Sequence, residues 1–168
     1  PIEKDTKNLL DCINKYTCKS ELEINTEKYG MQEAESSTEL ENLPPILQIC
    51  LQRTGYDTIT CRTLKKEIPL SFKSDFDLVQ FTGNEKDEYI LYAVLSHKGE
   101  SDCGHFCVFI RDFSDTSDFE NSKWFKYSDS VVNEVSSKTA IDGNFGSNAS
   151  TNPLMAYMLY YVRKSDQN

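Results

Sequence analysis

The sequence predicts an α+β domain built on an antiparallel sheet, and three observations support this fold class. Two apolar segments, 89–97 and 105–111, flank a glycine-containing connection in the pattern of a β-hairpin. Two further segments, 123–132 and 154–163, are rich in aromatic and β-branched residues, which favour strands. A stretch near the N-terminus, 6–18, has the three-to-four spacing of a helix. A chain of 168 residues fits a single domain.

The predicted helix near the N-terminus has a cap and one apolar stripe. Asp5 or Thr6 can cap it, and Leu9 and Ile13 recur at the spacing of one buried face. We therefore expect a short helix over residues 6–18.

The chain between this helix and the apolar hairpin has weaker signals. Residues 19–42 are rich in Glu, Ser, Thr and Asn, so we expect surface connections and at most short elements there. A Pro-Pro pair then precedes residues 46–53, which begin as a strand. Residues 63–72 carry a weaker strand signal that ends at Pro69.

The hairpin segments are expected at the centre of the sheet. Residues 89–97 are apolar on both faces, as in a strand that is buried on both sides, and residues 105–111 alternate similarly. A polar loop over 112–122 leads to the third strand, which contains the only tryptophan. Residues 136–152, rich in Ser, Asn and Gly, are expected to form a short helix or loop, and the segment after them closes the sheet.

The cysteine pattern indicates reduced thiols rather than disulfides or a metal site. The six cysteines are irregularly spaced, and Cys50 and Cys107 lie inside apolar runs. No CxxC pair exists, and Cys103 and Cys107 run from a turn into a strand, so neither a metal nor another cofactor is implied. We therefore expect an intracellular protein, cytoplasmic or nuclear.

Charge and hydropathy argue against two classes of partner. The net charge is −9, from 27 acidic and 18 basic residues, and no basic run could follow a phosphate backbone, so no nucleic acid is expected. The longest apolar run is far short of the roughly 20 residues that span a bilayer, so no membrane is expected either. An acidic surface favours a basic protein or peptide ligand, although solubility alone also explains the excess of acidic residues.

The first residue is Pro1, so the chain is either processed or an excerpt of a longer protein.

Both histidines lie in the central hairpin segment. His105 begins a strand beside a glycine-containing turn, and a histidine fixed there is a candidate general base because its ordinary pKa is close to neutrality. A structural imidazole, hydrogen-bonded at the end of a strand, is the alternative.

Five motifs resemble the histidine-bearing half of a ubiquitin-specific protease, and their order and spacing match throughout. They are Leu43–Arg53, Tyr89–Gly99, Gly104–Phe106, Trp124–Asp129 and Ala156–Arg163. Upstream, Lys28–Glu35 is similar to the herpesvirus-associated member of that family, which lacks the zinc-binding finger cysteines of many relatives. Together these motifs cover nearly the whole chain.

The resemblance implies a papain-like cysteine protease fold, in which an antiparallel palm sheet with a few short helices carries the general base. His105 matches the histidine that takes the proton of a thiol nucleophile. Ser128 occupies the usual position of the aspartate that orients this ring, and Asp129 follows it. Because successive strand residues face opposite sides, Asp129 would need a bulge or a strand end to reach the ring. The substrate class implied is ubiquitin joined through its terminal glycine.

The resemblance also implies a channel for the tail of ubiquitin. The residues that match positions along this channel are Tyr56, His97, Ser101, Cys103, Gly104 and Phe106. A residue without a side chain is expected at position 104, because the incoming diglycine needs a close approach to the backbone there. A packing role is the alternative for each of the six.

Several departures from the family pattern bear on activity. No cysteine lies in the nucleophile box of the family, and Cys12, the only helical candidate, has neighbours unlike that motif. Arg53 precedes Thr54 rather than phenylalanine, a cysteine replaces the first of the two glycines before the histidine, and Phe106 replaces tyrosine. This chain alone is therefore not expected to hydrolyse a substrate.

Two hypotheses follow. In the first, the chain is the C-terminal part of a deubiquitinase catalytic domain, and its partners are ubiquitin or a ubiquitinated protein and a nucleophile-bearing N-terminal half, in the same polypeptide or on a separate chain. In the second, it is a pseudoprotease that binds ubiquitin or acts as a scaffold. An unrelated β-rich interaction domain is a third reading.

Overall fold

The computed structural model describes residues 2–3, 5–101, 103–114, 122–146 and 154–166. Its main sheet has the strand order β10-β9-β8-β7-β11-β3, β6 also pairs with β7, and all of these pairs are antiparallel. The predicted antiparallel sheet with a few short helices is therefore confirmed. The strands of this sheet are β3 (Ile46–Cys50), β6 (Asp75–Asp77), β7 (Glu88–Gly99), β8 (Gly104–Arg111), β9 (Trp124–Ser128), β10 (Val131–Val135) and β11 (Met155–Arg163).

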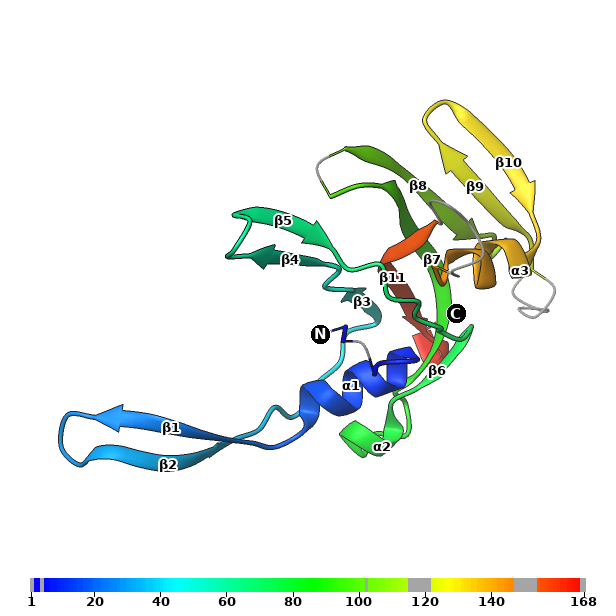
Figure 1. Cartoon of the computed structure of the whole chain (residues 1–168). Coiled ribbons are helices and arrows are strands. Elements are labelled where there is room, and N and C mark those ends of the chain that lie inside the picture. Colours follow the sequence, from blue (N-terminus) through cyan, green and yellow to red (C-terminus); the bar gives the residue numbers. More distant parts are fainter. Residues whose placement is uncertain (1, 4, 102, 115–121, 147–153, 167–168) are drawn as a thin grey trace.

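Two separate hairpins and a few short helices complete the described part of the chain. The hairpins are β1 (Ser20–Thr26) with β2 (Gly30–Ser36), and β4 (Thr54–Asp57) with β5 (Arg62–Lys65). The helices are α1 (Leu9–Thr17), α2 (Val79–Thr82) and α3 (Ser137–Ala140), with the 3-10 turns η1 (Asp142–Asn144) and η2 (Lys164–Asp166). In Figure 1, the β1–β2 hairpin extends away from the main sheet. No helix among the described residues is both long and apolar enough to cross a membrane.

The main hydrophobic cluster lies on the face of the sheet that carries Val94, which we call the inner face. Val94 of β7 pairs with Phe109 of β8 and with Leu159 of β11, and all three side chains are buried. Helix α1 contributes Leu9 and Cys12 to the same buried cluster. The prediction that 89–97 forms a central strand is confirmed, because β7 is buried on both faces along most of its length.

Helix α1 begins later than the sequence predicts. Asn8, not Asp5 or Thr6, is its N-cap, and its Oδ1 accepts a hydrogen bond of 2.9 Å from the backbone N–H of Asp11. The Asp11 carboxylate accepts in return from the N–H groups of Asn8 and Lys7. This reciprocal pair is a capping box, and it satisfies amides at the start of the helix more fully than a cap at residue 5 or 6 could.

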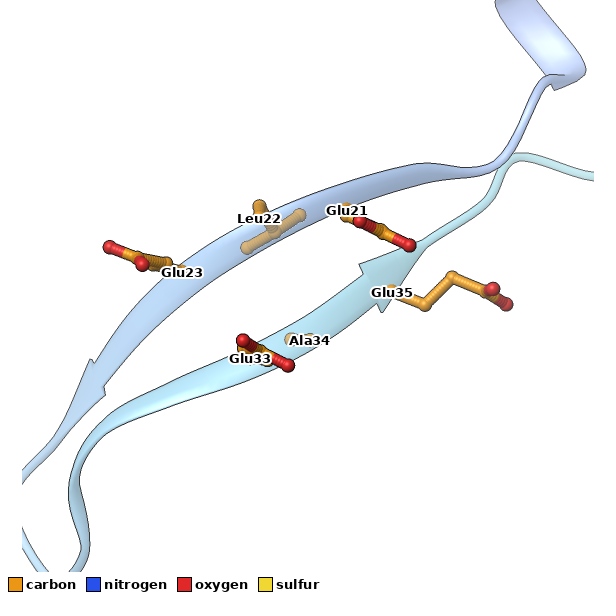
Figure 2. Close-up of a pocket in the computed structure, with 6 residues that line it drawn as sticks. All are labelled: Glu21, Leu22, Glu23, Glu33, Ala34 and Glu35. Carbon is orange, nitrogen blue, oxygen red and sulfur yellow. The ribbon is translucent and has the colours of Figure 1, made fainter.

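The prediction of at most short elements over residues 19–42 is wrong. β1 and β2 are seven residues each, and Leu22 and Ile24 alternate with glutamates along β1. The acidic composition hides this period-2 pattern. Figure 2 shows the glutamates of both strands, and the register sets Glu21 opposite Glu35 and Glu23 opposite Glu33. Like charges directly opposite one another destabilise a hairpin, and Lys19 pairs with only one of these four, Glu35.

The segment 123–132 is a hairpin rather than one strand. β9 ends at Ser128, and β10 begins at Val131 after a two-residue turn. Asp129, the first residue of the turn, has a φ of +51°, which asparagine, aspartate and glycine tolerate best. An aspartate followed by a serine, between an aromatic run and a β-branched one, is the sequence signal for this turn.

Three other predicted segments end differently in the structure. The strand predicted over 46–53 ends at Cys50, and within 63–72 only the first part belongs to β5. β11 lies inside the sheet between β7 and β3, so it does not close an edge. Parts of the predicted loops at 112–122 and 136–152 lie outside the described residues.

Arg53 is buried just beyond β3, where the chain has left the ladder. Its side chain is fully buried, and Nε donates to the carbonyl of Ala156 at 2.6 Å while Nη1 donates to that of Ile68 at 2.7 Å. Burial lowers the pKa of this guanidinium to about 10. The arginine therefore joins the β3–β4 connection to β11 and to the segment before β6.

Candidate active site

His105 lies at the exposed rim of the main sheet. It is the second residue of β8, on the inner face that also carries Cys107 and Phe109, and its side chain is 47% exposed. Its Nε2 lies 2.7 Å from Ser128 Oγ and 3.8 Å from Asp129 Oδ2. Only the serine is thus within hydrogen-bond distance of the ring.

The register of β8 against β9 brings these groups together. Val108 pairs with Tyr127 and Arg111 with Trp124. Continued toward the rim, the same register sets Cys107 opposite Ser128, so His105 becomes the diagonal neighbour of Ser128 on one face of the sheet. Trp124 is fully buried and fixes the far end of β9.

The turn after β9 allows Asp129 to approach the ring as well. A strand residue following Ser128 would face the opposite side, but the positive φ of Asp129 ends the strand and redirects its side chain. The carboxylate is 82% exposed, so solvent weakens its interaction with an imidazolium. Because Ser128 and Asp129 both lie on the Nε2 side, Nδ1 is the nitrogen left for a reacting group.

The β4–β5 hairpin closes over the connection between β7 and β8. Lys65 Nζ donates to the carbonyl of Gly99 at 2.5 Å, and Ser101 Oγ donates to that of Thr63 at 2.8 Å. Tyr56 pairs with Thr63 across the hairpin and is exposed. Thr63 thus links Ser101 and Tyr56, both predicted to line the tail channel, because it bonds the first and pairs with the second.

The other predicted channel residues divide by exposure. Cys103, Gly104 and Phe106 are exposed, and the Phe106 side chain is among the larger apolar groups left open to solvent. His97 is only 6% exposed and lies beneath them, so it offers little surface to a ligand. Gly104 also has a reason to be small that the sequence does not suggest, because a Cβ there would collide with the His97 ring.

No thiol in the described core has the environment of a nucleophile. Burial raises the pKa of Cys12 and that of Cys107, whereas a reactive cysteine needs a lowered pKa. The remaining cysteines are free and exposed. Within the described residues, no three metal-ligating side chains are close enough to hold an ion.

The sequence that forms this exposed histidine site and the strands around it matches a known family. The sequence profile described as "Ubiquitin carboxyl-terminal hydrolase" matches residues 3–161. The chain belongs to the ubiquitin carboxyl-terminal hydrolase family. The family resemblance drawn from the motifs is confirmed at this level.

Relatives within this family share the sequence over nearly the whole chain. "Ubiquitin carboxyl-terminal hydrolase 7" of Drosophila melanogaster is 31% identical over 97% of this chain and 15% of its own length. "Ubiquitin carboxyl-terminal hydrolase 5" of Schizosaccharomyces pombe is 30% identical over 96% of this chain and 16% of its own length. The chain thus spans less than a fifth of either relative.

A solved structure confirms the predicted fold class. A chain of the "SAGA Ubp8/Sgf11/Sus1/Sgf73 DUB module bound to ubiquitin aldehyde" superposes with a TM-score of 0.74 at 22% identity. The match covers 96% of this chain and 34% of that one. The papain-like fold is therefore shared by a ubiquitin-specific protease domain, at an identity too low to carry more than the fold.

Two residues that support the site were not predicted from the sequence. Nothing in the sequence distinguishes Lys65 from other surface lysines, because its contact with Gly99 depends on where the β4–β5 hairpin lies. Tyr157 lies at a β-bulge between Ala156 and Met158, where it packs against His97. A tyrosine within an aromatic strand gives no signal of a bulge.

His97 should make folding stability depend on pH. Burial, with smaller contributions from the charges of Lys65 and His105, lowers the pKa of His97 below its ordinary 6.5. As the pH falls below the unfolded value, the unfolded chain binds a proton that the folded chain does not, so the free energy of unfolding decreases.

We expect His97→Phe to reduce this dependence. The measurement is urea unfolding of the unaltered protein and of the variant at about pH 7.5 and at about pH 5.5, because histidine changes its charge between these values. Other titrating groups are common to the two proteins, so the difference between them reports His97. An equal loss of stability in both proteins on acidification would contradict the assignment.

Proposed function

We propose that this chain is the ubiquitin-recognising, general-base half of a thiol-dependent deubiquitinase that cleaves after the C-terminal glycine of ubiquitin. The observation that carries the proposal is the exposed His105 ring, held by Ser128 at 2.7 Å beside the loop that Lys65 and Ser101 fasten. The general base is thereby oriented at the rim, where a substrate tail can reach it. Membership of the family supports the substrate class.

In the proposed reaction, the nucleophilic thiolate comes from a part of the enzyme outside this chain, on an N-terminal half of the same polypeptide or on a separate chain. His105 takes the thiol proton at Nδ1, and the thiolate attacks the carbonyl carbon of the terminal glycine. The imidazolium then gives its proton to the departing lysine amine, and a water completes hydrolysis of the thioester. Ser128 and Asp129 hold the ring in the tautomer with a proton on Nε2.

The proposed tail channel is formed by residues around the connection between β7 and β8. The exposed Tyr56, Cys103, Gly104 and Phe106 and the half-buried Ser101 supply it, and His97 supports it from below. The solved DUB module of the same fold is bound to ubiquitin aldehyde. Ubiquitin or a ubiquitinated protein is therefore the proposed partner.

A catalytically inactive ubiquitin-binding module is the second candidate function. Ser128 stands where a carboxylate is expected, and the carboxylate of Asp129 is 3.8 Å from the ring and 82% exposed. A neutral hydroxyl cannot stabilise an imidazolium as an ion does. Replacing the orienting aspartate of a serine protease triad by an amide costs about 10⁴-fold in rate, or ~5 kcal/mol of barrier.

We also propose that the chain belongs to the herpesvirus-associated branch of the family, from the likeness of residues 28–35, and that it works in the cytoplasm or nucleus. Neither proposal affects the chemistry above.

Binding of the ubiquitin tail is the direct test of the proposed function. When this chain is titrated into isotopically labelled ubiquitin, we expect chemical-shift changes at the glycine-glycine terminus. Phe106→Asp should weaken the binding by about tenfold, because it places a charge in the channel.

Val132→Asp is the matched control, since Val132 is 52% exposed and Phe106 is 51% exposed. Val132 lies on β10, away from the proposed channel, so this variant should bind as the unaltered chain does. No shift at the tail, or equal effects of the two variants, would refute ubiquitin recognition.

A reactive probe separates the active enzyme from the inactive module. The full-length parent protein is treated with ubiquitin that carries a thiol-reactive C-terminal group. In the active enzyme, His105→Ala should abolish labelling, and Ser128→Asp should speed it by roughly 10- to 10⁴-fold through a restored carboxylate. A parent protein that binds ubiquitin but is never labelled, even with Ser128→Asp, would favour the inactive module.

A further inference from the structure

His97, the buried histidine of the main sheet, has no role in the proposed reaction. His97 lies near the end of β7, where it pairs with Phe106 of β8 and Met155 of β11. Its ring lies 4.5 Å from that of Phe106 and 5.5 Å from that of Tyr157, measured between centroids. Among the described residues, its Nδ1 has no hydrogen-bond partner.

A β-bulge brings the tyrosine to this ring. The β7–β11 register shifts between Ala156 and Met158, which leaves Tyr157 as the extra residue. The bulge is fixed from the other side by two hydrogen bonds. The N–H of Leu51 donates to the Tyr157 carbonyl at 2.9 Å, and Arg53 Nε donates to the Ala156 carbonyl at 2.6 Å.

The ring of His97 occupies the space that a side chain at position 104 would need. A Cβ on Gly104 would lie 2.6 Å from His97 Cε1 and 2.5 Å from the Lys98 carbonyl oxygen. Gly99, which pairs with Gly104, has a φ of +113°, and a Cβ there would lie 2.7 Å from the Gly104 Cα. The two glycines let the start of β8 rest directly on the ring.

We propose that His97 is a positioning residue for His105. Its ring lies between Phe106 and Tyr157, and Gly104 packs directly on it. The ring thereby fixes the direction in which the chain enters β8 at His105. Because Ser128 Oγ is 2.7 Å from the His105 ring, a small change in that direction breaks the contact. The consequence for catalysis rests on the proposed function, whereas the positioning itself does not.

The experiment uses NMR of the whole chain without ubiquitin, so its outcome is independent of ubiquitin binding. With two histidines in the sequence, each ring gives a separable set of signals, and the His97 variants leave only that of His105. The readout is the proton–proton contact between the His105 ring and the β-protons of Ser128, together with the ¹⁵N shift of Nε2.

We expect His97→Ala to weaken this contact severalfold and to shift the Nε2 signal. His97→Phe retains a planar ring at the same place and should preserve both readouts. Val94→Ala is the control, because it removes buried volume from the same strand on the opposite face, against Phe109. This variant should lose stability without changing the His105 signals.

An unchanged His105–Ser128 contact in His97→Ala would overturn the proposal, and so would an equal loss in Val94→Ala. If His97→Ala does not fold, Gly104→Ala provides the second test, because the added methyl pushes against the ring from the other side. A Gly104→Ala protein that keeps the contact would also overturn the proposal.

Discussion

The antiparallel register of β8 between β7 and β9 is the constraint on which the site depends. Each of these strands buries one face or both, so a slip of one residue would turn the core-facing set outward and is strongly disfavoured. Phe109 opposite Val94 and Trp124 opposite Arg111 fix the register deep in the sheet. The contact of His105 with Ser128 follows at the rim. An exposed ion pair could not specify this geometry, because solvent weakens it and its side chains are mobile.

The rim is held through a series of contacts that begins far away in the sequence. Arg53 binds the Ala156 carbonyl, which belongs to the strand residue before the Tyr157 bulge. Tyr157 then packs on His97, and His97 packs under Gly104. On the other side, Asp129 adopts a positive φ that costs energy and is retained beside the ring. The site is thus placed by buried groups and a strained turn, while its own polar groups remain accessible.

The sequence predicts the parts of this fold in which hydrophobic periodicity decides the structure. The central strands around Val94 and Phe109, the last strand and the existence of the first helix all follow from apolar spacing. The β1–β2 hairpin does not, because glutamates on alternate positions of β1 obscure its period. The turn at Asp129 and the bulge at Tyr157 depend on tertiary pairing, which local patterns do not contain. The motifs identify His105 and Ser128, but only the structure shows that Ser128, and not Asp129, lies within hydrogen-bond distance of the His105 ring.

The register itself can be measured without any assumption about function. In a uniformly labelled sample of this chain, cross-strand proton contacts between β8 and β9 report which residues face one another. We expect contacts between Val108 and Tyr127 and between Ile110 and Phe125. Contacts displaced by one residue along β9 would place Ser128 on the face away from His105, and they would contradict the register described above.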